Sequence, residues 1–264
     1  MNLALTSDCH QCFGLCCVAL PYANSADFPI NKDGGVPCRH LSTDHRCNIH
    51  NKLKNKGFNG CVAYECFGAG QYVSQKMYDR QDWRNNPELS NEMFAVFPLI
   101  QQLHEMLWYL DRALCLKEVE SLYSELQNMY DETVELTRKS PEEIFQLDMQ
   151  LHRSKVNQLL VEVSEIYRKQ GRKKEKKSLD YIGANLSGRD FKGSSFRGTL
   201  MIAANLSHAD LRKADFIGTD LRDADLSHAN LAGALFLTQS QINSAKGNVH
   251  TKIPEFLEWP KHWL

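Results

Sequence analysis

Cysteine is the residue type whose number and spacing point most directly to chemistry in this 264-residue chain. Eight of the nine cysteines fall within the first 66 residues, and Cys115 stands apart from them. The first residues do not resemble an export signal, so we expect a cytoplasmic, reducing setting in which such a cluster binds metal. The alternative is a secreted domain held together by disulfides. The eight candidate metal ligands are Cys9, Cys12, Cys16, Cys17, Cys38, Cys47, Cys61 and Cys66.

The spacing within this cluster indicates how the thiols could be shared. Cys9 and Cys12 form a chelating pair, because two intervening residues let both thiolates turn toward one ion. The side chains of Cys16 and Cys17 diverge, so this adjacent pair suits two metal positions, a cluster, or one ligand plus an outer thiol. Eight thiolates could therefore build two zinc sites of four cysteines each, or one iron–sulfur cluster with spare cysteines.

Histidines in the same region are the next candidates. His10, His40, His45 and His50 could supply nitrogen ligands, but with eight thiols available we expect most of them to be exposed loop residues. His45 and His50 flank Cys47 and are the first to test. The isolated Cys115 lies in a helical pattern between leucines, which favours a buried structural thiol.

The cysteine motifs resemble those of a known family. The segments Cys9-x2-Cys12-x3-Cys16-Cys17, Cys38-Arg-His-Leu41, Cys47-Asn-Ile49 and Gly60-Cys61-Val-Ala-Tyr64 are similar to the CxxCxxCC family of zinc- or iron-chelating proteins, which includes flagellin lysine methylases. The resemblance covers roughly residues 8–66. It implies a bound metal, either zinc or an iron–sulfur cluster.

A second pattern fills the C-terminal part of the chain, where residues 183–237 repeat every five residues and, beneath that, every twenty. The segments starting at Ala184, Ala204 and Ala224 read Ala-Asn-Leu-Ser, Ala-Asn-Leu-Ser and Ala-Asp-Leu-Ser. A period of five fits neither a helix nor a flat strand, so it predicts a solenoid, and the twenty-residue echo predicts four pentads per coil.

In such a coil the central Leu or Phe of each pentad and the small residue two positions before it point inward. The other three positions face solvent, so Asp215, beside the central Phe216, is expected to be exposed. Twelve central positions on four sides make three coils. The predicted internal ladders are Phe196–Phe216–Phe236, Leu186–Leu206–Leu226, Phe191–Leu211–Leu231 and Tyr181–Met201–Leu221.

This pattern resembles the pentapeptide-repeat family, and the resemblance implies a right-handed quadrilateral β-helix. A stack of three coils needs caps over its open ends. Residues 238–246 are expected to form a helical cap. The tail from 253 to 264 would cover it with Phe256, Leu257, Trp259 and Trp263.

Between these two patterns the composition is helical. From Ser90 onward Leu, Glu, Gln, Met and Lys dominate, and Ser140-Pro141-Glu142-Glu143 predicts a capped helix start. The apolar face expected for that helix comprises Ile144, Leu147, Leu151, Leu159, Val163 and Ile166.

We therefore predict a multidomain chain. Its parts are a Cys-rich metal-binding module (1–75), an α-helical domain with a basic C-terminal linker (76–177), the pentapeptide-repeat β-helix (178–237), and a C-terminal cap and tail (238–264). The linker is the stretch Arg168–Lys177, which carries seven basic residues. It could touch nucleic acid or an anionic surface, or it could simply be the basic end of a helix that leads into a linker.

Charge and motifs narrow the function classes. The formal charge of −1 gives the protein no bulk electrostatic attraction to nucleic acid. The sequence contains no run of 18 apolar residues, so it does not predict a membrane-spanning helix. A DNA mimic that protects topoisomerase needs an acidic solenoid, but seven acidic and seven basic residues cancel between 179 and 247. No nucleotide-binding glycine loop or nucleophile elbow is found. An interaction or scaffold protein ranks first, and an iron–sulfur protein-modifying enzyme resembling flagellin lysine methylases ranks second.

The outward positions of the solenoid predict where contacts are made. Apolar side chains gather at the corner between the Tyr181 side and the Phe196 side, which a soluble monomer rarely leaves bare. We expect this corner to pack against the helical segment, or against a second copy of the chain in a homo-oligomer, with other proteins as the general class of partner. The corner residues are Ile182, Leu200, Ile202, Ile217, Leu235 and Leu237.

Overall fold

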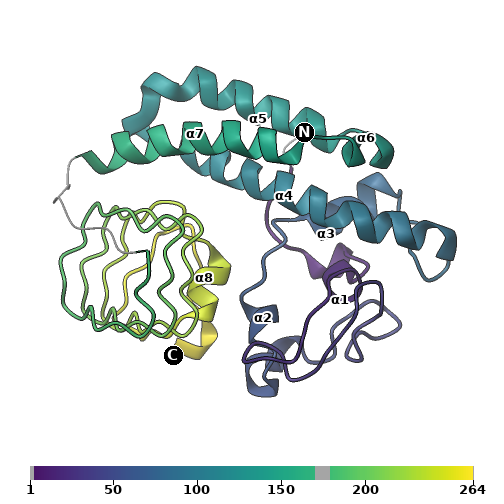
Figure 1. The fold of residues 1–264 in the computed structure, drawn as a ribbon, viewed down its shortest axis with the longest axis horizontal. Coiled ribbons are helices and arrows are strands. Elements are labelled where there is room, and N and C mark those ends of the chain that lie inside the picture. The colour runs from purple at the N-terminus through teal and green to yellow at the C-terminus, as the bar shows by residue number, and fades with distance from the viewer. Residues whose placement is uncertain (1–2, 170–178, 264) are drawn as a thin grey trace. The chain divides into compact units, whose positions relative to one another are not determined.

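The computed structural model describes residues 3–169 and 179–263, and the chain separates into two compact units, Met1–Leu160 and Val161–Leu264 (Figure 1). Apart from its first two residues, the basic stretch Arg168–Lys177 lies outside the described residues. The first unit consists of helices and loops, and the second is dominated by repeated coils. In the described parts of the chain, no helix is both long and apolar enough to cross a membrane.

Two long helices form the frame of the first unit. Helices α4 (Ser90–Leu114) and α5 (Tyr123–Thr137) lie side by side and are joined by the 3-10 helix η6 (Lys117–Leu122) (Figure 1). Apolar residues at helical spacing give α4 a continuous buried face. Its large apolar side chains that are fully buried are Met93, Val96, Phe97, Ile100, Leu103, Leu107 and Leu110. The N-terminal loops contact α4 through two short helices, α1 (Leu15–Val18) and α3 (Ala69–Tyr72).

The end of α4 explains why the expectation for Cys115 is wrong. The helix stops at Leu114, and Cys115 is its C-cap residue, exposed to solvent. A residue one position beyond the last helical turn does not share the buried face, although the apolar pattern continues through Leu116.

The capping box at Ser140 forms, but the helix that it starts is short. The Ser140 hydroxyl accepts from the Glu143 amide at 3.4 Å, and the Glu143 carboxylate accepts from the Ser140 amide at 3.0 Å. Helix α6 (Pro141–Phe145) then ends, and α7 (Met149–Arg168) starts afresh. The break shifts the helical phase, so Leu151 is 56% exposed. The side chains that α6 and α7 bury are Ile144, Val156, Leu160, Val163 and Tyr167, of which only Ile144 and Val163 belong to the predicted face.

The cysteine-bearing part of the first unit has little regular structure. Its helices are η1 (Cys9–Gln11), α1 (Leu15–Val18), η2 (His50–Lys52), η3 (Lys54–Lys56), α2 (Asn59–Val62), α3 (Ala69–Tyr72), the π-helical η4 (Val73–Met77) and η5 (Pro87–Leu89). Two isolated antiparallel bridges, Tyr22 with Lys32 and Leu41 with Cys47, tie the loops. Its core is small, with Leu15, Val18 and Phe58 among its most buried residues.

The repeats of the second unit form stacked coils. Parallel bridges join residues twenty positions apart, from Asp180 with Leu200 to Asp215 with Leu235, at four places per coil. Between 179 and 263 the pairings are single bridges and no longer strand is assigned, because each side of a coil is only five residues long. The predicted period of twenty is thus the period of the pairing.

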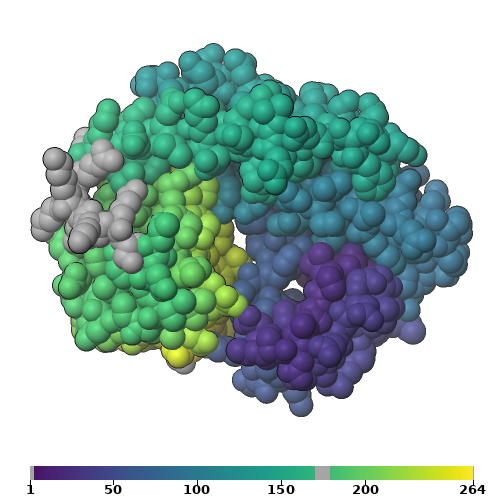
Figure 2. Space-filling model, viewed as in Figure 1, coloured from purple at the N-terminus to yellow at the C-terminus, as the bar shows by residue number. Residues whose placement is uncertain are grey.

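The central positions of the pentads fill the inside of the coils. All of the predicted ladder residues are buried except Tyr181, which is partly buried against the same cluster. Phe196 and Phe216 lie 5.5 Å apart between ring centroids. In the space-filling view the repeat coils present a closed surface, because Leu, Phe and Ala side chains occupy the interior (Figure 2).

The backbone adopts a similar conformation at the corners of the coils. After the first eleven of the twelve centres, the residue two positions on has positive φ, and this position holds Gly at six corners and Ala, His, Lys or Asp at the other five. The Asp or Asn one position before the centre accepts a hydrogen bond from the amide one position after it, as Asp190 does from Lys192 at 3.2 Å. This Asx-type bond explains why Asp and Asn recur in the pentads.

Asp215 departs from this scheme and corrects a prediction, because it is fully buried. Its carboxylate accepts from the Ser164 hydroxyl at 2.5 Å and pairs with Arg197 at 3.0 Å. Arg168 donates to the Ser164 hydroxyl at 2.8 Å and to the Gly193 carbonyl at 3.0 Å. The last two turns of α7 therefore cover this side of the coils.

The residues of the apolar corner differ in burial. Leu235 and Leu237 are 3% and 0% exposed, and Leu237 belongs to the core formed by the coils and the cap. Ile202 and Ile217 are partly buried, whereas Ile182 and Leu200 remain 52% and 41% exposed. Nearby, the Tyr167 hydroxyl of α7 donates to the Gly233 carbonyl at 3.0 Å. The expectation that the corner is covered is therefore met in part.

The C-terminal cap follows the prediction closely in its helix and partly in its tail. Helix α8 (Gln239–Ser244) is capped by Thr238 and buries Ile242 against the last coil. Leu257 and Trp263 join that core, whereas Phe256 and Trp259 are 44% and 40% exposed. Trp263 closes the stack because Gly247 leaves room for its indole, which a Cβ would approach at 2.6 Å.

We expect Phe216→Ala to lower the free energy of unfolding by about 3–5 kcal/mol, because it empties the middle of a filled ladder. Phe256→Ala, which removes a ring of the same type from an exposed tail position, should change it by about 0.5 kcal/mol or less. Chemical denaturation of the two variants measures both values. Equal losses would contradict the ladder.

We expect Asp215→Ala to cost about 3–5 kcal/mol, because it leaves Arg197 and Ser164 without their buried partner. Asp190→Ala removes an Asp from the same pentad position where it is exposed, and should cost about 1 kcal/mol through loss of the corner hydrogen bond. Thermal and denaturant unfolding compare the pair. If the two substitutions cost the same, α7 does not dock through Asp215.

Candidate functional site

The eight N-terminal cysteines are brought together in one module, and all of them are free thiols. Cys38 is buried, Cys9 is exposed, and the other six are partly buried. Their neighbours define two groups, which we call the first and second thiol groups. The first comprises Cys9, Cys12, Cys16 and Cys66, and the second comprises Cys17, Cys38, Cys47 and Cys61.

The first thiol group meets at Gly70 in α3. A Cβ at Gly70 would lie 2.7 Å from Cys12 Sγ and 3.8 Å from Cys66 Sγ, so the absence of a side chain creates room for both sulfurs. Burial raises the pKa of Cys12 to about 11, and nearby Cys66 and Cys9 also raise it. Burial likewise raises the pKa of Cys9, with Cys66 as the next cause.

Tyr64 connects Cys16 with this group. Burial raises the pKa of the Tyr64 phenol, and the neighbouring sulfurs of Cys16, Cys66 and Cys12 raise it further. The phenol therefore lies near thiols from two separate segments, one carrying Cys12 and Cys16 and the other carrying Cys66.

The second thiol group is held by backbone pairing. The Cys38 amide donates to the Cys17 carbonyl at 2.9 Å, and the Tyr22 hydroxyl donates to Cys38 Sγ at 3.2 Å. The pKa of Cys47 is raised, first by a hydrogen bond with Cys17 and then by burial. Burial raises the pKa of Cys61 to about 11, and Cys47 and Cys38 add to the rise.

Cys16 and Cys17 link the two groups at the first turn of α1, where their sulfurs lie 4.0 Å apart. This contact contradicts the predicted divergence of the two side chains, although Cys16 and Cys17 also have different further neighbours. Within residues 3–169 and 179–263, no three Cys, His, Asp or Glu side chains are placed closely enough to form a finished metal site. What the fold supplies is eight soft sulfur donors within one module.

A buried lysine stands beside the second thiol group. The Lys32 ammonium donates to the carbonyls of Val18, Asp33 and Val36 at 2.9–3.0 Å. Burial lowers its pKa, while the sulfurs of Cys38 and Cys17 raise it. No motif in the sequence marks this residue, because its three partners are backbone carbonyls.

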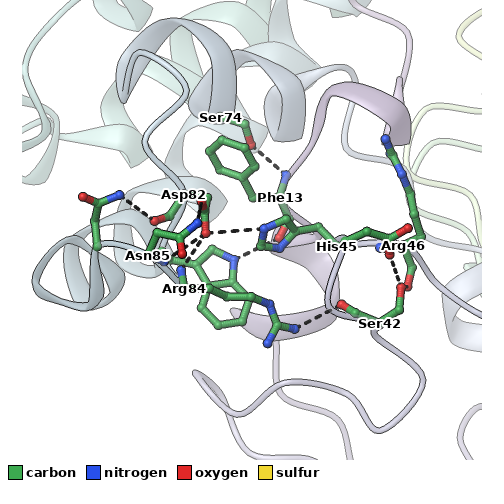
Figure 3. Close-up of polar contacts among 11 residues, drawn as sticks. Phe13, Ser42, His45, Arg46, Ser74, Asp82, Arg84 and Asn85 are labelled. Atoms are coloured by element: carbon green, nitrogen blue, oxygen red, sulfur yellow. Dashed lines mark hydrogen bonds and ion pairs between the residues drawn. The ribbon is translucent and has the colours of Figure 1, made fainter.

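The loop that carries Cys9 and Cys12 is fixed by a polar network that the sequence also did not reveal (Figure 3). The Trp83 indole donates to the Phe13 carbonyl at 2.9 Å, and the Phe13 amide donates to the Ser74 hydroxyl at 3.0 Å. Arg46 reaches the carbonyls of Cys9 and His10. The chelating pair is thus anchored to η4, to residues 82–86 and to the loop at 42–46.

His45 belongs to this network. Its ring lies 5.4 Å from Phe13 and 5.6 Å from Trp83, and Nε2 is 3.5 Å from Asp82 Oδ1 (Figure 3). Contrary to the general expectation for these histidines, it is largely covered, with a side chain 15% exposed. His10 and His50 are exposed as expected.

A second histidine supports the turn that follows Cys66. His104 in α4 is fully buried, and its Nδ1 lies 2.9 Å from the Phe67 carbonyl. Burial lowers its pKa to about 4, so the ring is neutral and Nδ1 carries the donated proton. It holds Phe67 at a φ of 50° and thereby sets the direction of the chain after Cys66.

Comparison with known proteins finds one match to the repeats and one match to nearly the whole chain. A family model described as "Pentapeptide repeats" matches eight copies over residues 182–216 and 201–236. The chain is also similar to the "Uncharacterized protein YybG" of Bacillus subtilis (strain 168), with 53% identity over 264 aligned residues, covering 98% of this chain and 95% of the relative. That match includes the cysteine module and the repeats together.

We expect Gly70→Ala to lower the free energy of unfolding by about 1–3 kcal/mol, because the new methyl group overlaps Cys12 Sγ. Alanine favours a helix more than glycine does, so α3 itself cannot cause the loss. In a Cys12→Ala background the overlap disappears and the cost should be much smaller. A double-mutant cycle of denaturant unfolding measures the coupling, and its absence would contradict the shared pocket.

Proposed function

The chain belongs to the same family as YybG and carries pentapeptide repeats in its C-terminal part, and from this premise we propose that it is a metal-stabilised interaction protein. The observation that carries the proposal is the convergence of eight free thiols in one module, which we divide into two sets of four by their neighbours. The metal would organise the N-terminal module, and the repeat coils would present the surface for partners.

The donor set fits zinc or an iron–sulfur centre. Four cysteines per ion is a common ligand set of structural zinc sites, and each thiol group offers four. Cys16 and Cys17 would then serve separate ions. In an iron–sulfur alternative four of the cysteines hold one cluster and the others remain spare. When bound, zinc supplies a redox-inert crosslink, whereas a cluster supplies electron transfer or radical chemistry.

The chain's own residues prepare for such a centre. A divalent ion with four thiolates carries a net charge of about −2, which the Lys32 ammonium beside the second thiol group would partly offset. The raised pKa values of the buried thiols arise from burial and from neighbouring sulfurs, both of which disfavour thiolates without a cation. A bound cation reverses this balance. The small core of the module leaves stability for the metal to supply.

The repeats support interaction rather than turnover. They imply a right-handed quadrilateral β-helix, and its interior is filled by the ladder residues, leaving no room for a substrate. The surface charges cancel between 179 and 247, which argues against imitation of DNA. The exposed apolar residues Leu179, Ile182 and Leu200 on the first coils offer a contact surface for a protein partner or a second copy.

The metal content of the full-length protein, purified without oxygen, tests the proposal. Two zinc ions per chain without visible absorbance support two structural centres. Iron, acid-labile sulfide and a brown colour support the cluster, and with it the alternative of a protein-modifying enzyme. Less than one metal ion per chain with all eight thiols reactive would overturn metal binding.

Single cysteine variants locate the ligands. Cys17→Ser should remove about one metal equivalent and lower the melting temperature, because a structural metal contributes directly to folding. Cys115→Ser is the matched control, since Cys115 is an exposed cysteine outside both groups. Elemental analysis of the two variants gives the comparison. Equal metal content would remove Cys17 from the ligand set.

A further inference from the structure

A column of three histidines stands on the surface of the repeat coils, apart from the cysteine module. The rings of His208 and His228 are stacked at 4.5 Å between centroids with an interplanar angle of 10°. His228 and His250 continue the column at 4.8 Å and 17°. The three residues come from two successive coils and from the cap.

The corner geometry of the coils sets up this column. His208 and His228 both have a φ of 60°, so their Cβ atoms leave equivalent corners in the same direction, one coil apart. Coils stack at about 4.8 Å, which is the spacing of paired strands. Asn248 aligns the cap, because its side-chain oxygen accepts from the amides of His228 at 3.2 Å and His250 at 3.0 Å.

The middle ring is suited to ligation at neutral pH. Burial lowers the pKa of His228, His208 and His250 lower it further, and Asp225 opposes them. An imidazole that stays neutral keeps a ring nitrogen free to donate its lone pair to a metal.

We propose that this histidine column binds one divalent ion of the kind that imidazole prefers, such as Zn²⁺, Ni²⁺ or Cu²⁺, between His228 and one of its two neighbours. Two nitrogen ligands at about 2.1 Å from an ion lie at most about 4.2 Å apart. In the stacked arrangement the ring planes are nearly parallel, and the lone pair of each nitrogen lies in its own ring plane. Two adjacent side chains must therefore turn out of the stack before both nitrogens can face one ion, which their exposed positions allow. His208 and His250 are two coils apart, at roughly twice the 4.8 Å spacing, and cannot share an ion.

This geometry agrees with the absence of any three-ligand site in the described residues. It also makes a sharp prediction about the ligands. His228 takes part in both possible pairs, whereas His208 and His250 each take part in one. Loss of His228 should therefore abolish binding, and loss of either outer histidine should weaken it only about twofold, since one of two equivalent positions remains.

The test is a titration of the full-length protein with Ni²⁺ after its cysteine centres have been saturated with zinc. Histidine side-chain NMR signals report which rings are broadened, and calorimetry gives the affinity. We expect one ion per chain and broadening of the three column histidines. His228→Gly should abolish this binding and still fold, because glycine holds the same corner two coils earlier, at Gly188.

Two controls make the result decisive. Asp223→Gly introduces glycine at another exposed corner and should leave binding unchanged. The double variant His208→Ala and His250→Ala should abolish binding, as His228→Gly does. Unchanged affinity in His228→Gly, complete loss in either single outer variant, or broadening confined to other histidines would each overturn the proposal. None of these outcomes bears on the cysteine centres, because these are occupied throughout.

Discussion

The corner of the pentad is the constraint on which the C-terminal structure depends. The chain turns at a residue with left-handed backbone conformation, two positions after the centre of a pentad. At many corners an Asp or Asn just before the centre accepts a hydrogen bond from the backbone amide just after it, which the turn would otherwise leave unpaired. Because this unit recurs every five residues, the inward side chains must form ladders and the outward ones columns. The filled core and the histidine column are two consequences of one turn. The five non-glycine corners adopt a backbone that side chains ordinarily avoid, so the stacking of the coils must hold them there.

Asp215 shows how the same corner can be put to another use. At many corners the Asp or Asn side chain only accepts a hydrogen bond from the nearby backbone amide. Asp215 accepts that bond with Oδ1, and its Oδ2 also accepts hydrogen bonds from Ser164 and Arg197. A buried carboxylate with partners on every side gives little net stability but tolerates only one arrangement of its neighbours. It therefore fixes where the last turns of α7 lie on the coils, while Gly193 and Gly233 let the helix approach closely.

The sequence predicted what is periodic and local. The twenty-residue pairing, the ladders, the cap helix at 239–244 and the capping box at Ser140 all follow from patterns within a few residues. The predictions of burial were wrong where a distant partner or the end of a helix determines the exposure of a side chain. Asp215 is buried by contacts with α7, and Cys115 is exposed because it lies just past the end of α4. Leu151 is exposed because the chain breaks between α6 and α7. For the candidate site the sequence supplied the eight cysteines, but not the contact between the sulfurs of Cys16 and Cys17. Which thiols meet depends on Gly70, Tyr64 and Cys38, whose neighbours come from distant loops.

The repeat coils and the cysteine module differ in the length of chain that their tertiary contacts close. Each coil pairs with a neighbour twenty residues away, so every set of pairings closes only a short loop. In the cysteine module Cys12 meets Cys66 across more than fifty residues of loop, with few buried apolar side chains along the way. The entropy lost on closing such a loop grows with its length, and the burial of few apolar side chains does not compensate for this loss. Anchors such as Arg46, Trp83 and Lys32 recover part of the cost through backbone carbonyls. A crosslink through the thiols would stabilise most where the loops are longest, which is where the cysteines converge.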